Sequence, residues 1–292
     1  MIKGQVYKEV GGLFWVKLNH AGIVVAKARG VIKLEEEIYV GDYVELSFEN
    51  DEYIIEKILE RKNILIRPYV SNVDQAIIVL APVPYPDFYV LDKQLISLLN
   101  KGIPSLVVLN KSDLKKAKLI EKQLKEQYCD TVNYLAVSSL NNIDIDKVRG
   151  CLNGKLTVLS GQSAVGKSSL INAILGDEYL LKTGEISKKI QRGKNTTRTI
   201  EIIDINNDAK IIDTCGFSSF ELSNIDSQKL KNYYLEFNEY SNKCEFLDCV
   251  HINERNCGIK QALLENKINK DRYDRYLKLY NEISNKEVKK YS

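Results

Sequence analysis

A glycine loop between a short strand and a helix constrains the fold of this chain more than any other sequence feature. Residues 161–168 have the sequence GQSAVGKS, which fits the pattern G-x-x-x-x-G-K-[ST]. Residues 157–159 before the loop form a short apolar strand, and residues 169–175 after it have helical spacing. Strand, glycine loop and helix in this order are the context that a phosphate-binding loop requires. We therefore predict an α/β domain built around a phosphate site.

The loop supplies the groups that bind phosphate. Gly161 and Gly166 allow turns that point successive backbone N–H groups at a phosphate chain, at the positive end of the helix dipole. Lys167 is expected to reach the β- and γ-phosphates, and the Ser168 hydroxyl to ligate Mg²⁺. The predicted nucleotide-binding residues of this segment are Gly161, Gln162, Ser163, Ala164, Val165, Gly166, Lys167, Ser168 and Ser169. The alternative is a glycine-rich turn without a ligand, and the motifs described below weaken it.

Composition sets few limits on what the chain binds. Its 292 residues are 44% hydrophobic and 28% charged, with a net charge of +3, which is ordinary for a globular protein and does not by itself indicate a nucleic-acid partner. The first residues lack the apolar core of a signal peptide, and no apolar run is long enough to cross a bilayer. We expect a cytoplasmic protein without a membrane partner, and nothing in the sequence indicates more than a monomer.

Short strands at regular spacing dominate residues 1–68. Turn signals separate five predicted strands, at residues 5–10, 13–18, 23–28, 43–48 and 53–59. This spacing predicts a small barrel of the oligonucleotide-binding (OB) kind. Trp15, the only tryptophan, is a candidate platform for stacking a base, although a lone aromatic residue in a strand is more often a packing residue.

A second motif ends a buried strand of the α/β pattern that begins at Asp74. Residues 105–109 run into Asn110-Lys111-Ser112-Asp113, an N-K-x-D sequence at the carboxyl end of a strand, where open α/β sheets bind their ligands. The Asp113 carboxylate is suited to accept two hydrogen bonds from guanine, whereas adenine offers no matching donor pair. A polar loop that caps the next helix is the alternative.

The other residues around this motif have predicted roles in the same site. Asn110 is expected to brace the neighbouring loops, and the Lys111 stem to lie over the purine face. Residues 133–137 form a predicted strand that ends in Ser138 and Ser139, and such a small-residue loop suits backbone contact with a guanine edge.

Two further segments are candidates for sensing the γ-phosphate. Residues 186–200 carry five basic side chains and no acid, which predicts a mobile basic loop in which Thr196 or Thr197 supplies a hydroxyl to Mg²⁺. A solvated basic loop without such a role is the alternative. A D-x-x-G sequence begins at a strand end, so that Asp213 would hold Mg²⁺ through water and the Gly216 N–H would contact the γ-phosphate.

Three cysteines and a histidine lie within fourteen residues near the C-terminus, at Cys244, Cys249, His251 and Cys257. Three thiolates and one imidazole can complete a tetrahedral Zn²⁺ site, and four protein ligands leave no open position for catalysis. We therefore predict one structural Zn²⁺ per chain. Unrelated buried cysteines are the alternative.

The order of the motifs carries further information, because N-K-x-D precedes Gly161 by 51 residues and D-x-x-G comes last. With these motifs, the paired threonines and the Cys/His cluster, the chain resembles the circularly permuted GTPases. Within them it resembles the ribosome small-subunit-dependent GTPase A family (RsgA, also YjeQ or YloQ) over essentially its whole length. The resemblance implies an OB-fold barrel at 1–68, a circularly permuted α/β P-loop GTPase domain at 69–231 and a mainly helical zinc-binding domain at 232–292.

The resemblance also implies a late maturation factor that binds the small ribosomal subunit and its rRNA and hydrolyses GTP to GDP and phosphate with Mg²⁺. Two departures bear on catalysis: Phe217 stands where many GTPases place a water-orienting glutamine, and Asn195 stands at the position of the family's switch-loop histidine. Asparagine can orient water but cannot act as a base. The predicted catalytic residues are Lys167, Asn195, Thr196, Thr197, Asp213 and Gly216. The alternative function is a nucleotide-gated ribosome- or RNA-binding module with vestigial hydrolysis.

Overall fold

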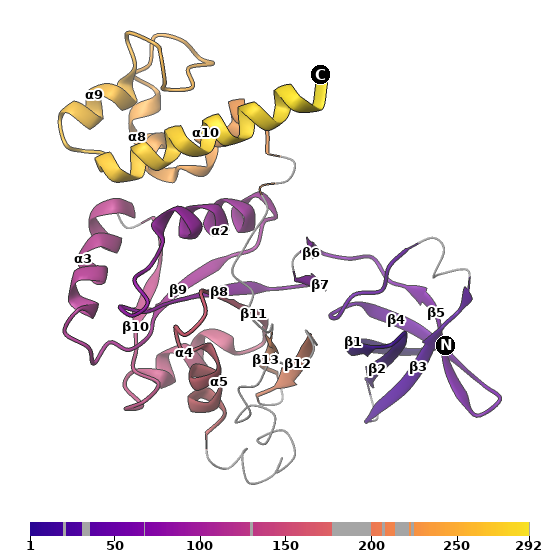
Figure 1. Cartoon of the computed structure of the whole chain (residues 1–292). Helices are drawn as coiled ribbons and strands as arrows, with labels where there is room; N and C mark the ends of the chain where they lie inside the picture. Colours follow the sequence, from indigo (N-terminus) through magenta and orange to yellow (C-terminus); the bar gives the residue numbers. More distant parts are fainter. Residues whose placement is uncertain are drawn as a thin grey trace.

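The N-terminal strands close into a barrel, the right-hand part of Figure 1. The computed structural model describes residues 1–19, 22–30, 36–66, 68–128, 131–176, 200–205, 208–213, 222 and 225–291. The barrel strands are β1 Ile2–Val10, β2 Leu13–Leu18, β3 Ile23–Ala28, β4 Tyr43–Glu49 and β5 Glu52–Ile58. Pairing follows the ring β1-β2-β3-β5-β4 and returns to β1, so the five predicted strands and the barrel are confirmed.

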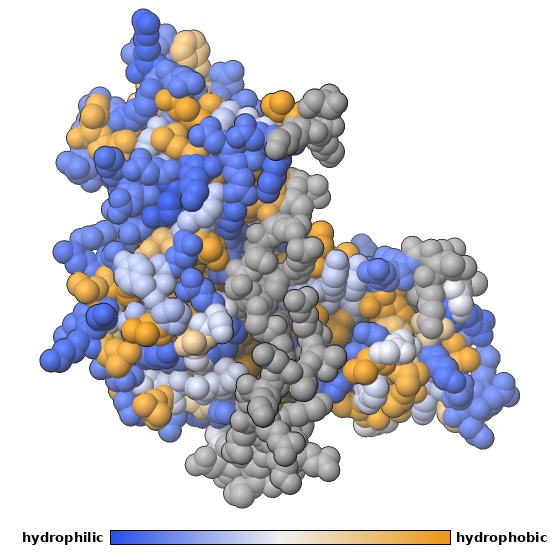
Figure 2. Space-filling view, viewed as in Figure 1, coloured by the Kyte–Doolittle hydropathy of each residue, from blue (hydrophilic) through white to orange (hydrophobic). Residues whose placement is uncertain are grey.

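Alternation along these strands decides which side chains fill the barrel. In β2, Phe14, Val16 and Leu18 are buried while the residues between them are partly exposed, as expected for strands whose successive side chains point to opposite faces. Trp15 is one of the outward residues: it lies outside the barrel core, and the Lys8 ammonium is 5.9 Å from its ring centroid. Figure 2 shows hydrophobic side chains reaching the barrel surface among hydrophilic ones, and the exposed apolar residues there include Ile23, Val25 and Phe48.

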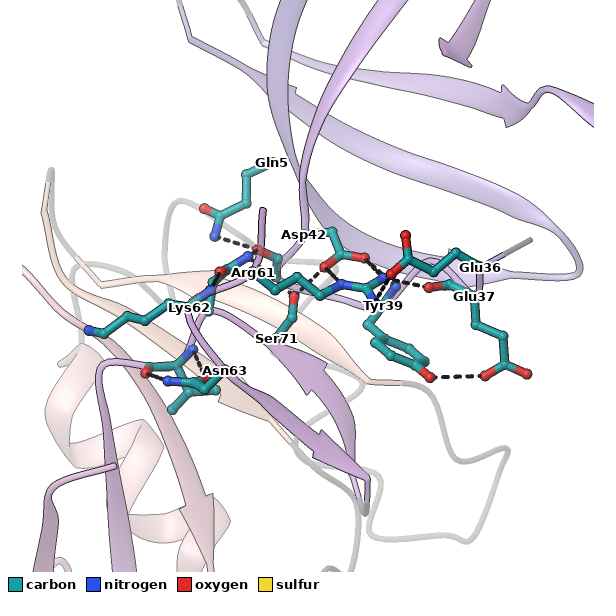
Figure 3. A network of polar contacts seen from close by, with 12 residues as sticks. Gln5, Glu36, Glu37, Tyr39, Asp42, Arg61, Lys62, Asn63 and Ser71 are labelled. Atoms are coloured by element: carbon teal, nitrogen blue, oxygen red, sulfur yellow. Dashed lines mark hydrogen bonds and ion pairs between the residues drawn. The ribbon is translucent and has the colours of Figure 1, made fainter. Parts of the chain in front are cut away.

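A hairpin of β6 Ile64–Ile66 and β7 Tyr69–Ser71 follows the barrel, and a buried polar network fastens it there (Figure 3). Asp42 of the barrel is fully buried and accepts two hydrogen bonds from the Arg61 guanidinium, at 2.7 and 2.8 Å. The Ser71 hydroxyl donates to the same carboxylate at 2.5 Å. The sequence patterns did not predict this hairpin, since its three-residue strands are too short to show a period.

A parallel sheet forms the centre of the molecule. Its strand order is β10-β9-β8-β11-β13-β12, and β12 alone is antiparallel to its neighbour. The strands are β8 Gln75–Leu80, β9 Ser105–Leu109, β10 Tyr134–Ala136, β11 Leu156–Ser160, β12 Glu201–Asp204 and β13 Lys210–Asp213. Every residue of β8 is buried because helices cover both faces of the sheet, which confirms the α/β prediction.

Four helices make the two outer layers of this sheet (Figure 1). α2 Phe88–Asn100 and α3 Ala117–Tyr128 pack on one face, and α4 Ile145–Leu152 and α5 Lys167–Leu175 pack on the other. α3 begins at Ala117, after a turn that follows the N-K-x-D sequence. α4 was not predicted; its eight residues show only a short apolar pattern, with Ile145, Val148 and Leu152 buried.

The C-terminal region is helical and packs above α2 in Figure 1. It comprises the 3₁₀ segments η1 Ser227–Tyr233 and η2 Leu235–Phe237, then α8 Asn238–Ser241, α9 Gly258–Leu264 and α10 Lys270–Tyr291. The apolar residues Leu230, Tyr234 and Phe237 have helical spacing and are buried, and two 3₁₀ segments that meet at Tyr234, rather than one α-helix, carry them. Among the described residues, none of the helices combines the length and apolar character needed to span a membrane.

A buried ionic cluster joins this region to the central sheet. Asp92 of α2 is fully buried, and its two oxygens lie 2.5 Å from the guanidinium groups of Arg272 and Arg275 on α10. The Tyr128 hydroxyl donates to Asp92, and Arg272 Nε donates to Glu236 at 2.7 Å. Since breaking a buried ion pair is costly, this cluster fixes where the C-terminal region packs on α2 and α3, the helices that cover this face of the sheet.

Candidate nucleotide site and metal centre

The glycine loop lies between the end of β11 and the start of α5, where both of its glycines are sterically required. Gly161 has φ 142°, and a Cβ there would lie 2.3 Å from the Val79 carbonyl oxygen. Gly166 has φ 94°, and a Cβ there would lie 2.5 Å from the Asn110 side-chain nitrogen. A side chain at either position would therefore displace a neighbouring loop or strand.

The Lys167 ammonium is held over this loop by two of its carbonyl groups. It donates to the carbonyl oxygens of Gly161 at 2.7 Å and Gln162 at 2.8 Å. Burial lowers the pKa of Lys167, and the nearby Asp213 carboxylate opposes that shift. The positive charge therefore sits at the mouth of the loop, close to the carboxylate that ends β13.

The remaining loop residues divide between surface and core. Val165 is buried and packs with the side chains beneath α5, so its part in a phosphate site is limited to its backbone. Gln162 is half-buried. The exposed residues at the mouth of the loop are Ser163, Ala164, Ser168 and Ser169.

Asn110 connects three loops through one fully buried amide. Its Nδ2 donates to the carbonyl oxygens of Val165 at 3.1 Å and Gly166 at 3.3 Å, in the glycine loop. Its Oδ1 accepts from the backbone N–H of Lys111 at 2.9 Å and of Ser139 at 3.0 Å. The glycine loop, the N-K-x-D loop and the Ser138-Ser139 loop are thereby held as one unit.

Lys111 and Asp113 flank the opening of this unit. Lys111 has φ 59°, and its ammonium donates to the carbonyl oxygens of Val83 and Ala164, both at 2.7 Å. Asp113 accepts a hydrogen bond from the Ser138 hydroxyl at 2.5 Å. Because Ser138 is buried and its backbone is hydrogen-bonded to Ile143 in both directions, it fixes the orientation of the Asp113 carboxylate.

The Ser138-Ser139 loop also makes contacts within the protein that the sequence did not predict. Its backbone N–H groups are engaged within the protein, Ser138 with the Ile143 carbonyl at 3.1 Å and Ser139 with Asn110. The Ser138 hydroxyl is the group that bears on the base site, since it holds Asp113. Sequence reasoning missed this hydroxyl, because nothing local to residue 138 indicates that residue 113 lies beside it.

Asp213 marks the other end of the site, at the end of β13. Burial and, next, the Glu201 carboxylate raise the pKa of Asp213, while Lys167 lowers it. Glu201 is the register partner of Asp213 in the β12–β13 pair and was not predicted as a site residue. The predicted residues Asn195, Thr196, Thr197, Gly216 and Phe217 lie outside the described residues.

The Cys/His cluster converges in the C-terminal region. His251 Nδ1 lies 3.6, 3.3 and 3.4 Å from the sulfur atoms of Cys244, Cys249 and Cys257, and all four ligand atoms lie within 4.8 Å of one another. Tetrahedral ligands at Zn–S and Zn–N bond lengths are about 3.5 to 3.8 Å apart. The donor set and its spacing therefore fit a single metal ion.

Surrounding groups hold these ligands in place. The Tyr273 hydroxyl donates to the His251 carbonyl at 2.5 Å, so α10 is tied to the metal loop. Burial, with Lys231 next, lowers the pKa of His251 to about 4, which favours the neutral imidazole that binds metals. Burial alone would raise the pKa of Glu254, but backbone N–H groups, among them those of Val250 and Ile252, lower it to about 2.

Comparisons with known proteins agree with this arrangement. A family model described as RsgA GTPase matches residues 58–223, and one described as RsgA N-terminal domain matches residues 3–54. The small ribosomal subunit biogenesis GTPase RsgA of Clostridium kluyveri is 41% identical over 298 residues, covering 99% of this chain and 100% of its own. Its counterpart in Ruminiclostridium cellulolyticum is 39% identical, with coverages of 95% and 92%.

Two solved structures share the fold over almost the whole chain. YjeQ from Thermotoga maritima superposes with a TM-score of 0.79 and 31% identity, over 97% of this chain and 98% of its own. YloQ, described as a circularly permuted GTPase, superposes with a TM-score of 0.76 and 27% identity, over 98% and 96%. The permuted order of the motifs thus has solved counterparts.

Proposed function

The chain belongs to the RsgA GTPase family, and from this we propose that it hydrolyses GTP as a biogenesis factor of the small ribosomal subunit. One observation carries the proposal: the buried Asn110 amide joins the glycine loop to the N-K-x-D loop. The phosphate-binding groups and the base-reading carboxylate thereby belong to one rigid site.

Guanine is selected at one end of this site. The Asp113 carboxylate, oriented by Ser138, accepts from the N1–H and exocyclic amine of the base. The Lys111 stem lies over the purine, held by its two carbonyl contacts. Adenine offers no matching pair of donors, so the carboxylate discriminates against ATP.

The phosphates occupy the glycine loop. Backbone N–H groups from Gly161 to Ser169 surround them, and the Lys167 ammonium neutralises charge on the β- and γ-phosphates. The exposed Ser168 hydroxyl offers an oxygen ligand for Mg²⁺, and the Asp213 carboxylate at the end of β13 is suited to hold the ion through a water molecule. Bound there, Mg²⁺ supplies charge neutralisation on the β- and γ-phosphate oxygens.

Hydrolysis requires a positioned water and little covalent chemistry from the protein. We assign Asn195 to orient that water, and Thr196, Thr197 and Gly216 to contact Mg²⁺ or the γ-phosphate, as their sequence motifs predict. An amide cannot accept the proton of the water. Turnover of the isolated protein is therefore expected to be slow and to rise on the ribosome.

The Cys/His cluster holds a structural Zn²⁺ in this proposal. Cys244, Cys249, His251 and Cys257 supply four ligands, the set typical of structural rather than catalytic zinc. The names of the relatives refer to the small ribosomal subunit, which this protein would bind in the cytoplasm. The OB-type barrel is suited to contact the rRNA of that subunit.

Nucleotide binding by the whole chain tests this function. We expect GTP and GDP to bind and ATP to bind at least about a hundredfold more weakly, since losing two hydrogen bonds to a charged group costs about 3 kcal/mol or more. Asp113→Asn should weaken guanine nucleotides and favour xanthine nucleotides, whose 2-oxo group accepts from the new amide. Asp146→Asn is the matched control, because the Asp146 side chain is 91% exposed on α4. Equal affinity for ATP and GTP would contradict the proposal.

A further inference from the structure

The barrel and the γ-phosphate end of the site are joined by one short strand. β12 is hydrogen-bonded to β1 of the barrel on one side, through the pair Lys8 and Glu201, and to β13 on the other. Glu201 is also the register partner of Asp213, so a single residue faces both the barrel and the nucleotide site. Figure 1 shows β12 and β13 on the side of the central sheet that faces the barrel.

The three side chains that lie opposite one another on β1, β12 and β13 do not alternate in charge: Lys8 is basic, but Glu201 and Asp213 are both acidic. The Lys8 ammonium lies 3.0 Å from a Glu201 oxygen, and the Lys8 side chain is only 17% exposed while that of Glu201 is 40% exposed. Glu201 and Asp213 are like charges placed opposite each other, an arrangement that destabilises a strand pair.

We propose that Lys8 and Glu201 are positioning residues for GTP binding: the ion pair neutralises Glu201 and holds its carboxylate towards the barrel and away from Asp213. This inference rests on the proposed GTP site. Without Lys8, an unneutralised carboxylate would stand beside the γ-phosphate end of that site. The barrel thereby raises the affinity of the site for GTP relative to GDP.

A second ion pair on the same seam provides a matched control. Lys17 of β2 lies 2.7 Å from Asp204, at the other end of β12, and the Tyr7 hydroxyl also donates to Asp204. The register partner of Asp204 is Lys210 rather than Asp213. Loss of Lys17 therefore weakens the attachment of the barrel to β12 without placing a bare carboxylate opposite Asp213.

Coulomb's law sets the expected size of the effect. One unit charge about 10 Å from another changes a binding constant about twofold at a dielectric constant of about 80, and about sixteenfold at about 20. GTP carries about one more negative charge than GDP at the γ end. We therefore expect Lys8→Met to reduce the ratio of GTP to GDP affinity by about threefold to tenfold.

The experiment measures GTP and GDP affinities of the full chain with Mg²⁺ for the wild type and five variants. Lys8→Arg, which keeps the pair, and Lys17→Met should each change the GTP to GDP ratio less than about twofold. Glu201→Gln should not lower the ratio, because it leaves the Lys8 charge unopposed. The double variant Lys8→Met/Glu201→Gln carries neither charge and should return the ratio to within about twofold of wild type. Thermal unfolding of each variant identifies any that fails to fold, and the double variant compared with wild type and Glu201→Gln then remains as the deciding comparison.

Three outcomes would overturn the inference. They are an unchanged ratio in Lys8→Met, an equal change in Lys17→Met, and a double variant Lys8→Met/Glu201→Gln whose ratio stays as low as that of Lys8→Met. A wild-type chain that binds neither GTP nor GDP would instead refute the proposed function, so the two failures are distinguishable.

Discussion

Replacing Asn110 with aspartate tests whether one buried amide holds the nucleotide site together. The two side chains have nearly the same shape, but the Nδ2 donor becomes an oxygen. That oxygen would face the carbonyl oxygens of Val165 and Gly166, which are 3.1 and 3.3 Å from Nδ2. The acceptor role towards Lys111 and Ser139 would persist. The substitution thus affects the glycine loop and spares the other two loops.

The cost follows from these contacts. Two hydrogen bonds at about 0.5 to 1.5 kcal/mol each are lost, and the unmatched carbonyls and the buried carboxyl add about 1 to 3 kcal/mol. We expect the free energy of unfolding of Asn110→Asp to fall by about 3 to 5 kcal/mol. We expect about 3 kcal/mol of this loss to weaken the phosphate-binding conformation of the glycine loop, which lowers GTP affinity by more than about a hundredfold.

The loss in the free energy of unfolding of Asn110→Asp should be larger at high pH than at low pH. Burial favours the neutral form of the new carboxyl, so its pKa in the folded variant lies above the unfolded value of about 3.9. The folded state then binds the proton more tightly than the unfolded state. The variant is therefore closest to wild type below about pH 4 and loses stability as the pH rises through the folded pKa.

Urea unfolding at pH 5 and pH 8, with GTP binding at pH 8, measures both effects. Asn133→Asp is the control, because Asn133 is exposed before β10, and it should change stability by less than about 0.5 kcal/mol. If Asn110→Asp unfolds within about 1 kcal/mol of wild type and binds GTP normally, the amide is not the brace described here.

Two further substitutions test the C-terminal region. Cys249→Ser should reduce bound zinc from about one per chain, measured by elemental analysis, and weaken the helical signal, because structural zinc contributes folding energy. A fully zinc-loaded Cys249→Ser protein would contradict the ligand assignment. Arg272→Met should lower the free energy of unfolding by about 3 to 5 kcal/mol, since it leaves the buried Glu236 without its cation. The control is Lys286→Met, whose exposed pair with Glu282 should be worth less than about 1 kcal/mol, and equal losses in the two variants would refute the clustering argument.

Local patterns in the sequence were sufficient for the elements and motifs that depend on near neighbours. The barrel strands alternate in burial, β8 and β9 are continuous apolar runs, and the glycine loop lies between β11 and α5 as predicted. In each case the residues that decide the structure are within a few positions of one another. The permuted order of the motifs was also visible, because it requires only their sequence and not their contacts.

The unpredicted features join residues that are far apart in the chain. The Lys8–Glu201 pair spans 193 residues, and the Asp92–Arg275 contact spans 183. No periodicity links such partners, and a lone charged residue in a strand or helix is usually a solvated one. The 3₁₀ turns before Asn238 were missed for a different reason: apolar residues three and four apart suit either helix type.

Steady-state phosphate release from GTP and from ATP, with and without purified small ribosomal subunits, tests the proposed function most directly. We expect the protein alone to release phosphate from GTP slowly. Small subunits should raise this rate at least about tenfold, which is equivalent to lowering the barrier by about 1.4 kcal/mol, and should cause no such rise with ATP. Tight GTP binding with release that stays flat on small subunits would contradict a ribosome-stimulated GTPase and would leave a nucleotide-gated binding module.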